Sequence, residues 1–121
     1  MDELLKIAKA LSDKNRVRIL NMLEVKPLCV CEITEILGIA TSTASSHLSI
    51  LREAGFIKDE KDGKWINYSI QADSKSQVIS DMLALLPSWL KDDSIVDADL
   101  KKIDVTDRYI ITMSLPKAEA V

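Results

Sequence analysis

The fold is decided by residues 27–57, P-L-C-V-C-E-I-T-E-I-L-G-I-A-T-S-T-A-S-S-H-L-S-I-L-R-E-A-G-F-I. Apolar residues three and four apart predict a short helix over 30–37, and Gly38 supplies the sharp turn that follows it. A longer helix is predicted over 41–54, with one apolar stripe and a polar outer face. This order of elements is typical of a helix-turn-helix, whose second helix enters the major groove of DNA.

The segment after this unit predicts a β-hairpin. Residues 56–58 and 64–70 alternate as two strands around Asp59–Gly63, in which Asp62-Gly63 is a strong hairpin turn. A hairpin directly after the second helix predicts a winged helix-turn-helix. The expected fold class is therefore mainly α with a β-hairpin wing.

The N-terminal segment predicts two more helices. Residues 2–12 and 15–24 carry helical apolar stripes, and the second of these helices is expected to turn Arg16 and Arg18 outward. Both helices then precede the helix-turn-helix and supply apolar surface to its core.

The C-terminal segment is less regular in its pattern. Residues 74–86 predict a helix, and Pro87 interrupts it because proline lacks the N–H that a helix interior needs. The proline is expected either to kink the helix or to begin a separate turn that holds Trp89 and Leu90. From Asp92 the chain is expected to be acidic and irregular, and residues 109–115 have a strand-like apolar character without a predicted place in the fold.

Composition limits the class of protein. The chain has 121 residues, 47% of them hydrophobic, and a net charge of −3, which fits one globular domain. We divide it into a winged helix-turn-helix DNA-binding and dimerisation domain over 1–91 and an acidic extension of unknown role over 92–121. The acidic excess lies in residues 69–121, so the middle of the chain remains suited to DNA.

The sequence also predicts the location of the protein. No apolar run is long enough to span a membrane, and the acidic start predicts no secretion signal, so we expect a cytoplasmic protein without a membrane partner. Cysteines in that compartment stay reduced, and two cysteines separated by one residue would form a strained bridge. A disulfide is therefore not expected.

Three motifs together resemble the ArsR/SmtB family of metal-sensing repressors. They are L-C-V-C-E-I at 28–33, S-S-H-L-S-I-L-R-E-A-G at 45–55 and D-G-K-W-I-N-Y-S-I at 62–70. The resemblance implies a homodimeric winged-helix repressor. In its arsenic-responsive branch, Cys29 and Cys31 match the metal-binding box, and Thr34 stands where some members have a third cysteine.

The cysteine pair predicts a site for a soft ion. Thiolates bind trivalent arsenic and antimony through sulfur, so we expect one of these as inducer and no organic cofactor. On a regular helix, residues two apart point about 200° away from each other. Cys29 and Cys31 can therefore chelate only if the first turn unwinds or if the pair straddles the helix start. The third ligand is left open between water, a small thiol and a cysteine of a partner subunit.

The outer face of helix 41–54 predicts the DNA contacts, and Thr41 or Ser42 is expected to cap that helix. Short hydroxyl side chains let the backbone approach phosphates, and wing lysines reach the DNA backbone or the minor groove. His47 is assigned a packing or phosphate-contact role. The predicted DNA-binding residues are Thr41, Ser42, Thr43, Ser45, Ser46, His47, Ser49, Arg52, Lys58, Lys61 and Lys64.

The first and last predicted helices carry more apolar side chains than one small core requires. The excess predicts a homodimer, and a two-fold dimer matches a palindromic operator in double-stranded DNA. The predicted interface residues are Leu4, Leu5, Leu11, Val78, Ile79, Met82 and Leu86.

The residues leave alternatives to an arsenic-released repressor. The same fold can serve as a thiol-oxidation sensor, or as a protein-interaction module that does not bind DNA. An enzyme is not expected, because the sequence has no phosphate-binding glycine loop, no nucleophile with a paired base and a single histidine.

Overall fold

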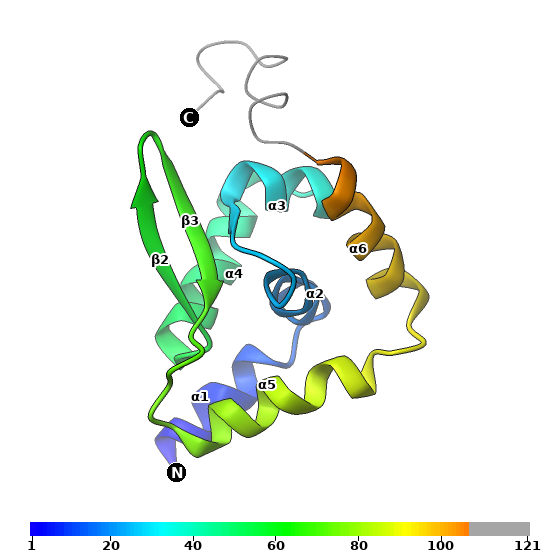
Figure 1. Ribbon diagram of the computed structural model, residues 1–121. Coiled ribbons are helices and arrows are strands. Elements are labelled where there is room, and N and C mark those ends of the chain that lie inside the picture. The colour runs from blue at the N-terminus through cyan, green and yellow to red at the C-terminus, as the bar shows by residue number, and fades with distance from the viewer. Residues whose placement is uncertain (107–121) are drawn as a thin grey trace.

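The computed structural model describes residues 1–106 and places helix α2 (Lys14–Leu23) at its centre (Figure 1). Ile19, Leu20 and Met22 of this helix are fully buried, because neighbouring helices cover several of its sides. The other helices of the described part are α1 (Asp2–Ala10), α3 (Val30–Leu37), α4 (Thr41–Ala54), α5 (Gln77–Trp89) and α6 (Ser94–Val105).

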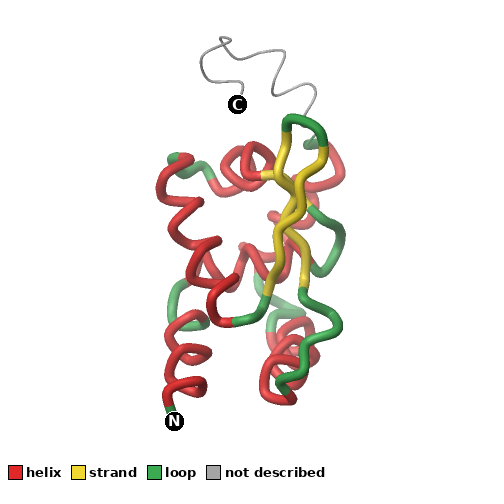
Figure 2. Tube along the Cα trace, turned by 90° about the vertical axis from the view of Figure 1, so that its left-hand side faces the viewer, coloured by secondary structure: helices red, strands yellow, loops and turns green. Residues whose placement is uncertain are grey.

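A three-stranded antiparallel sheet stands beside the helices (Figure 2). Its strands are β1 (Leu28–Cys29), β2 (Ile57–Asp62) and β3 (Trp65–Ile70), in the order β1-β3-β2. The inner strand β3 therefore pairs with the hairpin partner β2 and with the short strand that leads into α3. The predicted fold class, mainly helical with a hairpin wing, is confirmed.

The hairpin is longer than the sequence pattern predicts. Residues 59–62 were expected in the loop, but they belong to β2, and Asp62 pairs with Trp65. Pairing with β3 supplies the backbone hydrogen bonds, while the charged side chains remain in solvent. The turn is thus Gly63-Lys64, with Gly63 at the positive φ of 62° that the tight turn requires.

Helix α5 continues through Pro87, so the separate turn expected as one alternative at this residue is wrong. A proline removes one N–H from the hydrogen-bond ladder, and here it does so in the last turn of a helix that ends at Trp89. The cost is small enough for the helix to continue to its end.

The irregular segment expected from Asp92 onward is also wrong, because residues 94–105 form α6. Asp93 caps this helix and accepts hydrogen bonds from two of its first N–H groups. Val96 and Ile103 are buried in α6, and the helix packs on α2 and α3.

The division after residue 91 remains a prediction, and residues 109–115 lie outside the described part of the chain. No helix within residues 1–106 has the length and apolar character to cross a membrane.

Candidate functional site

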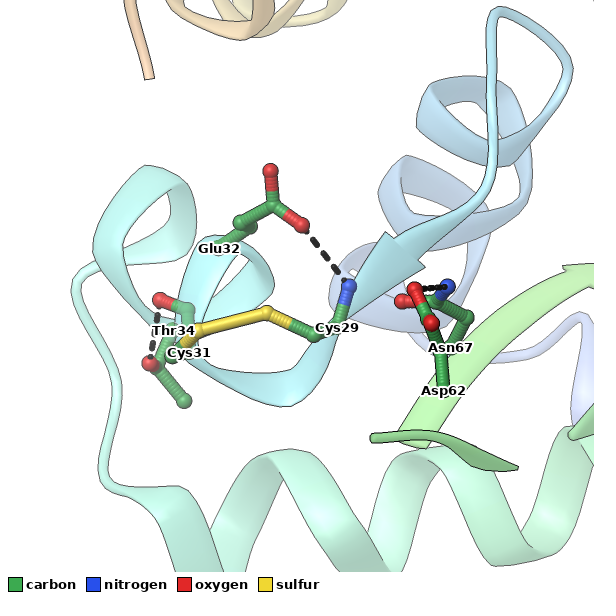
Figure 3. The surroundings of a disulfide bond; sticks show 6 residues. All are labelled: Cys29, Cys31, Glu32, Thr34, Asp62 and Asn67. Carbon is green, nitrogen blue, oxygen red and sulfur yellow. Dashed lines mark hydrogen bonds between the residues drawn. A yellow bond between two sulfur atoms is a disulfide. The ribbon is translucent and has the colours of Figure 1, made fainter. Parts of the chain in front are cut away.

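The cysteine pair straddles the start of α3 (Figure 3). Cys29 ends β1 and is the N-cap of α3, with an extended backbone at φ −86° and ψ 167°, and Cys31 lies in the first helical turn. Their Cα atoms are 5.5 Å apart, and their sulfur atoms are joined by a disulfide bond.

The expectation that the cysteines are unpaired and that a bridge is disfavoured is therefore wrong. The physical reason is the extended N-cap, which turns the Cys29 side chain toward Cys31 although a regular helix would point the two apart. Of the two geometries considered for chelation, the pair at the helix start is the one found. Unwinding of α3 is not needed to bring the sulfur atoms together.

The surroundings of the pair restrict access to it. Cys29 is 1% exposed, whereas Cys31 is partly exposed, so reagents reach the pair from the Cys31 side. The buried Glu32 accepts a 2.9 Å hydrogen bond from the backbone N–H of Cys29, which ties the first turn of α3 to the end of β1. These contacts hold the pair in one place.

The donor set of this site is incomplete for a metal ion. Within residues 1–106 there is no group of three or more His, Cys, Asp or Glu side chains that could hold an ion. The hydroxyl of Thr34 donates a 3.0 Å hydrogen bond to the Cys31 carbonyl and lies one turn along the helix on the same side (Figure 3). Two sulfur atoms fit a soft ion once the disulfide is reduced, and each chain supplies two of the three ligands that trigonal arsenic takes.

The site is connected to the predicted DNA-binding surface by two routes. Helix α3 packs on α4, and Cys29 lies opposite Asn67 of β3, which is the inner strand of the wing. A change in the shape of the pair can therefore reach both the recognition helix and the wing.

Helix α4 has the polar face that the sequence predicts. Ala44, Leu48 and Leu51 are buried, and the hydroxyl residues predicted to contact DNA are exposed, apart from Ser49, which is half-buried. The predicted cap at Thr41 or Ser42 is wrong: the N-cap is Ala40, whose side chain has no polar atom to bond the first N–H groups. Those N–H groups remain available to another acceptor.

The wing presents the three predicted lysines. Lys58, Lys61 and Lys64 are exposed, and Lys64 lies 4.7 Å from the centre of the Trp65 ring. Arg52 at the end of α4 bonds Asp59 of β2 at 3.0 Å, which joins the recognition helix to the wing. The predicted phosphate contact of Arg52 therefore competes with a carboxylate of its own chain.

Both arginines of α2 are bound within the molecule, so the expectation that they point outward is wrong. Arg16 is 8% exposed and bonds two backbone carbonyls of the chain as well as His47. Arg18 bonds both carboxylate oxygens of the buried Asp99 of α6 at 2.8 Å. The sequence held a signal for Arg16, because it lies four residues before Leu20 on the inward stripe of α2.

His47 faces α2 rather than solvent, and its side chain is 13% exposed. Its Nδ1 atom lies 3.1 Å from a guanidinium nitrogen of Arg16 and 3.9 Å from Oδ1 of Asp13. This geometry agrees with the packing role, and the phosphate contact of His47 stays a prediction.

The predicted interface residues divide by their exposure. Ile79 is 1% exposed inside the core, so its assignment to a surface is wrong. Its side chain packs beside Gly55 at the end of α4. The others are exposed or partly exposed: Leu4, Leu5, Leu11, Val78, Met82 and Leu86.

Comparisons with known proteins agree with this architecture. The model of the bacterial regulatory protein, arsR family, matches residues 13–59. The chain is 40% identical over 75 residues to a cadmium resistance transcriptional regulatory protein CadC homolog of Staphylococcus aureus, with 61% of this chain and 62% of the relative covered. It is 30% identical over 115 residues to the arsenic resistance transcriptional regulator ArsR1 of Pseudomonas putida, with 93% and 76% covered.

A solved structure shows the same fold. HlyU from Vibrio cholerae matches with a TM-score of 0.64 and 26% identity, over 75% of this chain and 95% of that one. The chain spans 54–62% of the length of several curated relatives, the staphylococcal protein among them. The family match covers α2, α3 and α4, and the relative from P. putida extends it over nearly all of the chain. The protein therefore belongs to the ArsR/SmtB family of winged helix-turn-helix regulators.

Proposed function

We propose that the protein is a DNA-binding transcriptional repressor that leaves its operator when trivalent arsenic or antimony binds Cys29 and Cys31. The observation that carries the proposal is the position of both sulfur atoms at the start of α3, the helix that packs on α4. A ligand at the pair acts directly on the unit that would contact DNA. The name of the P. putida relative, an arsenic resistance regulator, supports this class of inducer.

DNA binding is supported by the exposed face of α4. Its first turn combines exposed hydroxyl side chains with N–H groups that no side chain of Ala40 caps, and such groups bind phosphate oxygens well. The lysines of the wing extend the cationic surface along the DNA backbone. Two copies of the chain would place two such helices on the halves of a palindromic operator.

Release by a metalloid begins from the reduced pair. Two thiolates hold the ion, and a third donor comes from water, a small thiol or a partner subunit. An ion bound to both thiolates fixes the separation of two sulfur atoms that are not bonded to each other in the reduced pair. The start of α3 then shifts against β1, and the shift passes to α4 and to the wing. A coupling of about 1–3 kcal/mol corresponds to a change in DNA affinity of roughly 5- to 150-fold.

The test uses a duplex that the wild-type protein selects from random-sequence DNA, with affinity measured by fluorescence anisotropy in a phosphine reductant. Arsenite and antimonite are each expected to weaken binding to the duplex roughly 5- to 150-fold. Cys29→Ser and Cys31→Ser should bind the duplex normally and lose the response. Thr34→Ser, which keeps the hydroxyl donor to Cys31, is the control and should respond as wild type does.

Two results would overturn this assignment. If Cys29→Ser still leaves the duplex with arsenite, the cysteine pair is not the metalloid site. If cadmium releases the wild type and arsenite does not, the inducer is the ion in the name of the staphylococcal relative.

A thiol-oxidation sensor of the same fold is the second candidate, because the structure joins Cys29 and Cys31 by a disulfide. In this scheme the two thiols give two electrons to a peroxide, release two protons and form the bond. Hydrogen peroxide should then weaken DNA binding in the absence of metalloid, and a thiol reductant should restore it. Indifference of the wild type to peroxide would leave the metalloid alone as the signal.

A further inference from the structure

Arg16 is a buried cation that joins three helices. Its Nε donates to the carbonyl of Ala10 at 2.9 Å, and its Nη2 donates to the carbonyl of Lys9 at 3.0 Å. Both carbonyls lie at the C-terminal end of α1, and that of Lys9 also accepts from the backbone N–H of Ser12 at 3.1 Å and from its hydroxyl at 2.7 Å. The remaining nitrogen, Nη1, lies 3.1 Å from Nδ1 of His47 in the middle of α4. One guanidinium thus connects the end of α1, the start of α2 and the recognition helix.

The chemistry of this contact fixes the state of the imidazole. A guanidinium has no acceptor, so Nδ1 of His47 must accept the hydrogen bond from Arg16. The neutral ring then carries its proton on Nε2. Asp13 is close by, but the same Oδ1 already accepts from the N–H groups of Asn15 and Arg16, which caps α2. The polar groups of the contact therefore satisfy one another.

We propose that Arg16 and His47 are positioning residues that fix the direction of the recognition helix relative to α1. The inference rests on the proposed DNA binding and on the pairing of two copies through α1, whose Leu4 and Leu5 are each 57% exposed. In such a dimer, the direction of α4 relative to α1 sets the separation of the two recognition helices. That separation must match the spacing of the operator half-sites.

The rest of the boundary between α1 and α4 is incompletely packed. A groove of about 310 Å³ lies between the two helices. Apolar packing beside such a groove is non-directional, whereas the planar fork of an arginine bonds its partners in one geometry. The groove is lined by Leu5, Lys6, Lys9, Ile50 and Glu53.

The test measures spacing preference rather than affinity alone. The duplex selected by the wild type is compared with versions in which one base pair is inserted or deleted between the half-sites. In the wild type, the ratio of the affinities for the selected and the altered spacings measures the discrimination. His47→Ala should lower this ratio about tenfold. His47→Asn should retain it, because the amide oxygen takes the place of Nδ1. A purely structural role would lower binding to all spacings together and leave the ratio unchanged.

A second measurement stands apart from DNA. The ¹⁵N chemical shifts of the His47 ring should show an accepting Nδ1 in the wild type and a changed shift in Arg16→Met. If the wild type selects no duplex, the proposed function fails. The ring shifts alone then decide whether the contact between Arg16 and His47 exists. An unchanged ring shift in Arg16→Met, or an unchanged spacing ratio in His47→Ala, would overturn the inference.

Discussion

The recognition helix α4 is supported from two sides that differ in chemistry. On one side, α3 carries the sulfur pair Cys29–Cys31, whose thiols react with oxidants and bind soft ions. On the other side, Arg16 bonds backbone carbonyls and the His47 ring through N–H groups, which offer no thiol to an oxidant and no sulfur to a soft ion. A chemical signal at the sulfur pair can therefore move one support while the other stays fixed.

The largest expected effect breaks the buried ion pair that joins α6 to α2. Asp99→Asn should lower the free energy of unfolding by about 3 kcal/mol, because it removes one partner of a buried ion pair. The hydrogen bond to Asp99 raises the pKa of Arg18, and the variant removes the carboxylate that stabilises the charged guanidinium. Urea denaturation measures the loss.

The same variant tests whether α3 or α1, which pack on different sides of α4, depends more strongly on α6. Helix α6 packs on α3, and Lys102 donates to the carbonyl of Ile36 at 3.4 Å. Amide hydrogen exchange should therefore accelerate in α3 more than in α1. The matched control is Asp97→Asn, which breaks an exposed pair with Lys101 on the same helix and should change stability by less than about 0.5 kcal/mol. Equal losses in the two variants would contradict the role of the buried pair.

The next largest effect is an increase in arsenite affinity at the cysteine pair. Thr34→Cys should raise arsenite affinity about tenfold or more, a gain of about 1.4 kcal/mol, because a third thiol then stands one turn from Cys31. Calorimetric titration of the reduced protein measures the affinity, and sulfur-ligand counting by X-ray absorption should rise by one. Thr34→Ser should match the wild type in both measurements. No gain in the cysteine variant would place the third ligand elsewhere.

The sequence predicted the parts of the fold that local patterns define. Helices α3 and α4 have the bounds expected from their apolar spacing and from the turn at Gly38. Membership of a family of regulatory proteins also confirms that the chain is not an enzyme. The helix bounds and the turn at Gly38 depend on neighbouring residues, which a single sequence shows directly.

The features that were missed depend on distant residues. Strand β1 has two residues and exists because it pairs with β3, far along the chain. In α6, Asp99 interrupts the apolar stripe between Val96 and Ile103, and its burial becomes understandable only beside Arg18. The bridge at Cys29 followed from an extended N-cap that apolar spacing does not reveal.

The smallest expected effect concerns the N-cap of α2, which lies beside the contact between Arg16 and His47. Asp13→Ala should lower the free energy of unfolding by about 1 kcal/mol, because the carboxylate caps α2 through the N–H groups of Asn15 and Arg16. Burial raises the pKa of Asp13, but these N–H groups and the charge of the nearby Arg16 guanidinium outweigh burial and hold it below its ordinary value of 3.8.

The sign of the pH dependence follows from that direction. A folded-state pKa below the unfolded one gives a stabilisation that is complete above pH 3.8 and is lost as the pH falls through the folded value. Denaturation of wild type and Asp13→Ala at neutral and at acid pH should therefore show a stability difference that shrinks only under acid. A difference that persists unchanged in acid would mean that the charge of Asp13 does not contribute. Arg16 and His47 alone would then hold the start of α2 in place. The two sides of α4 would differ still more in their chemistry.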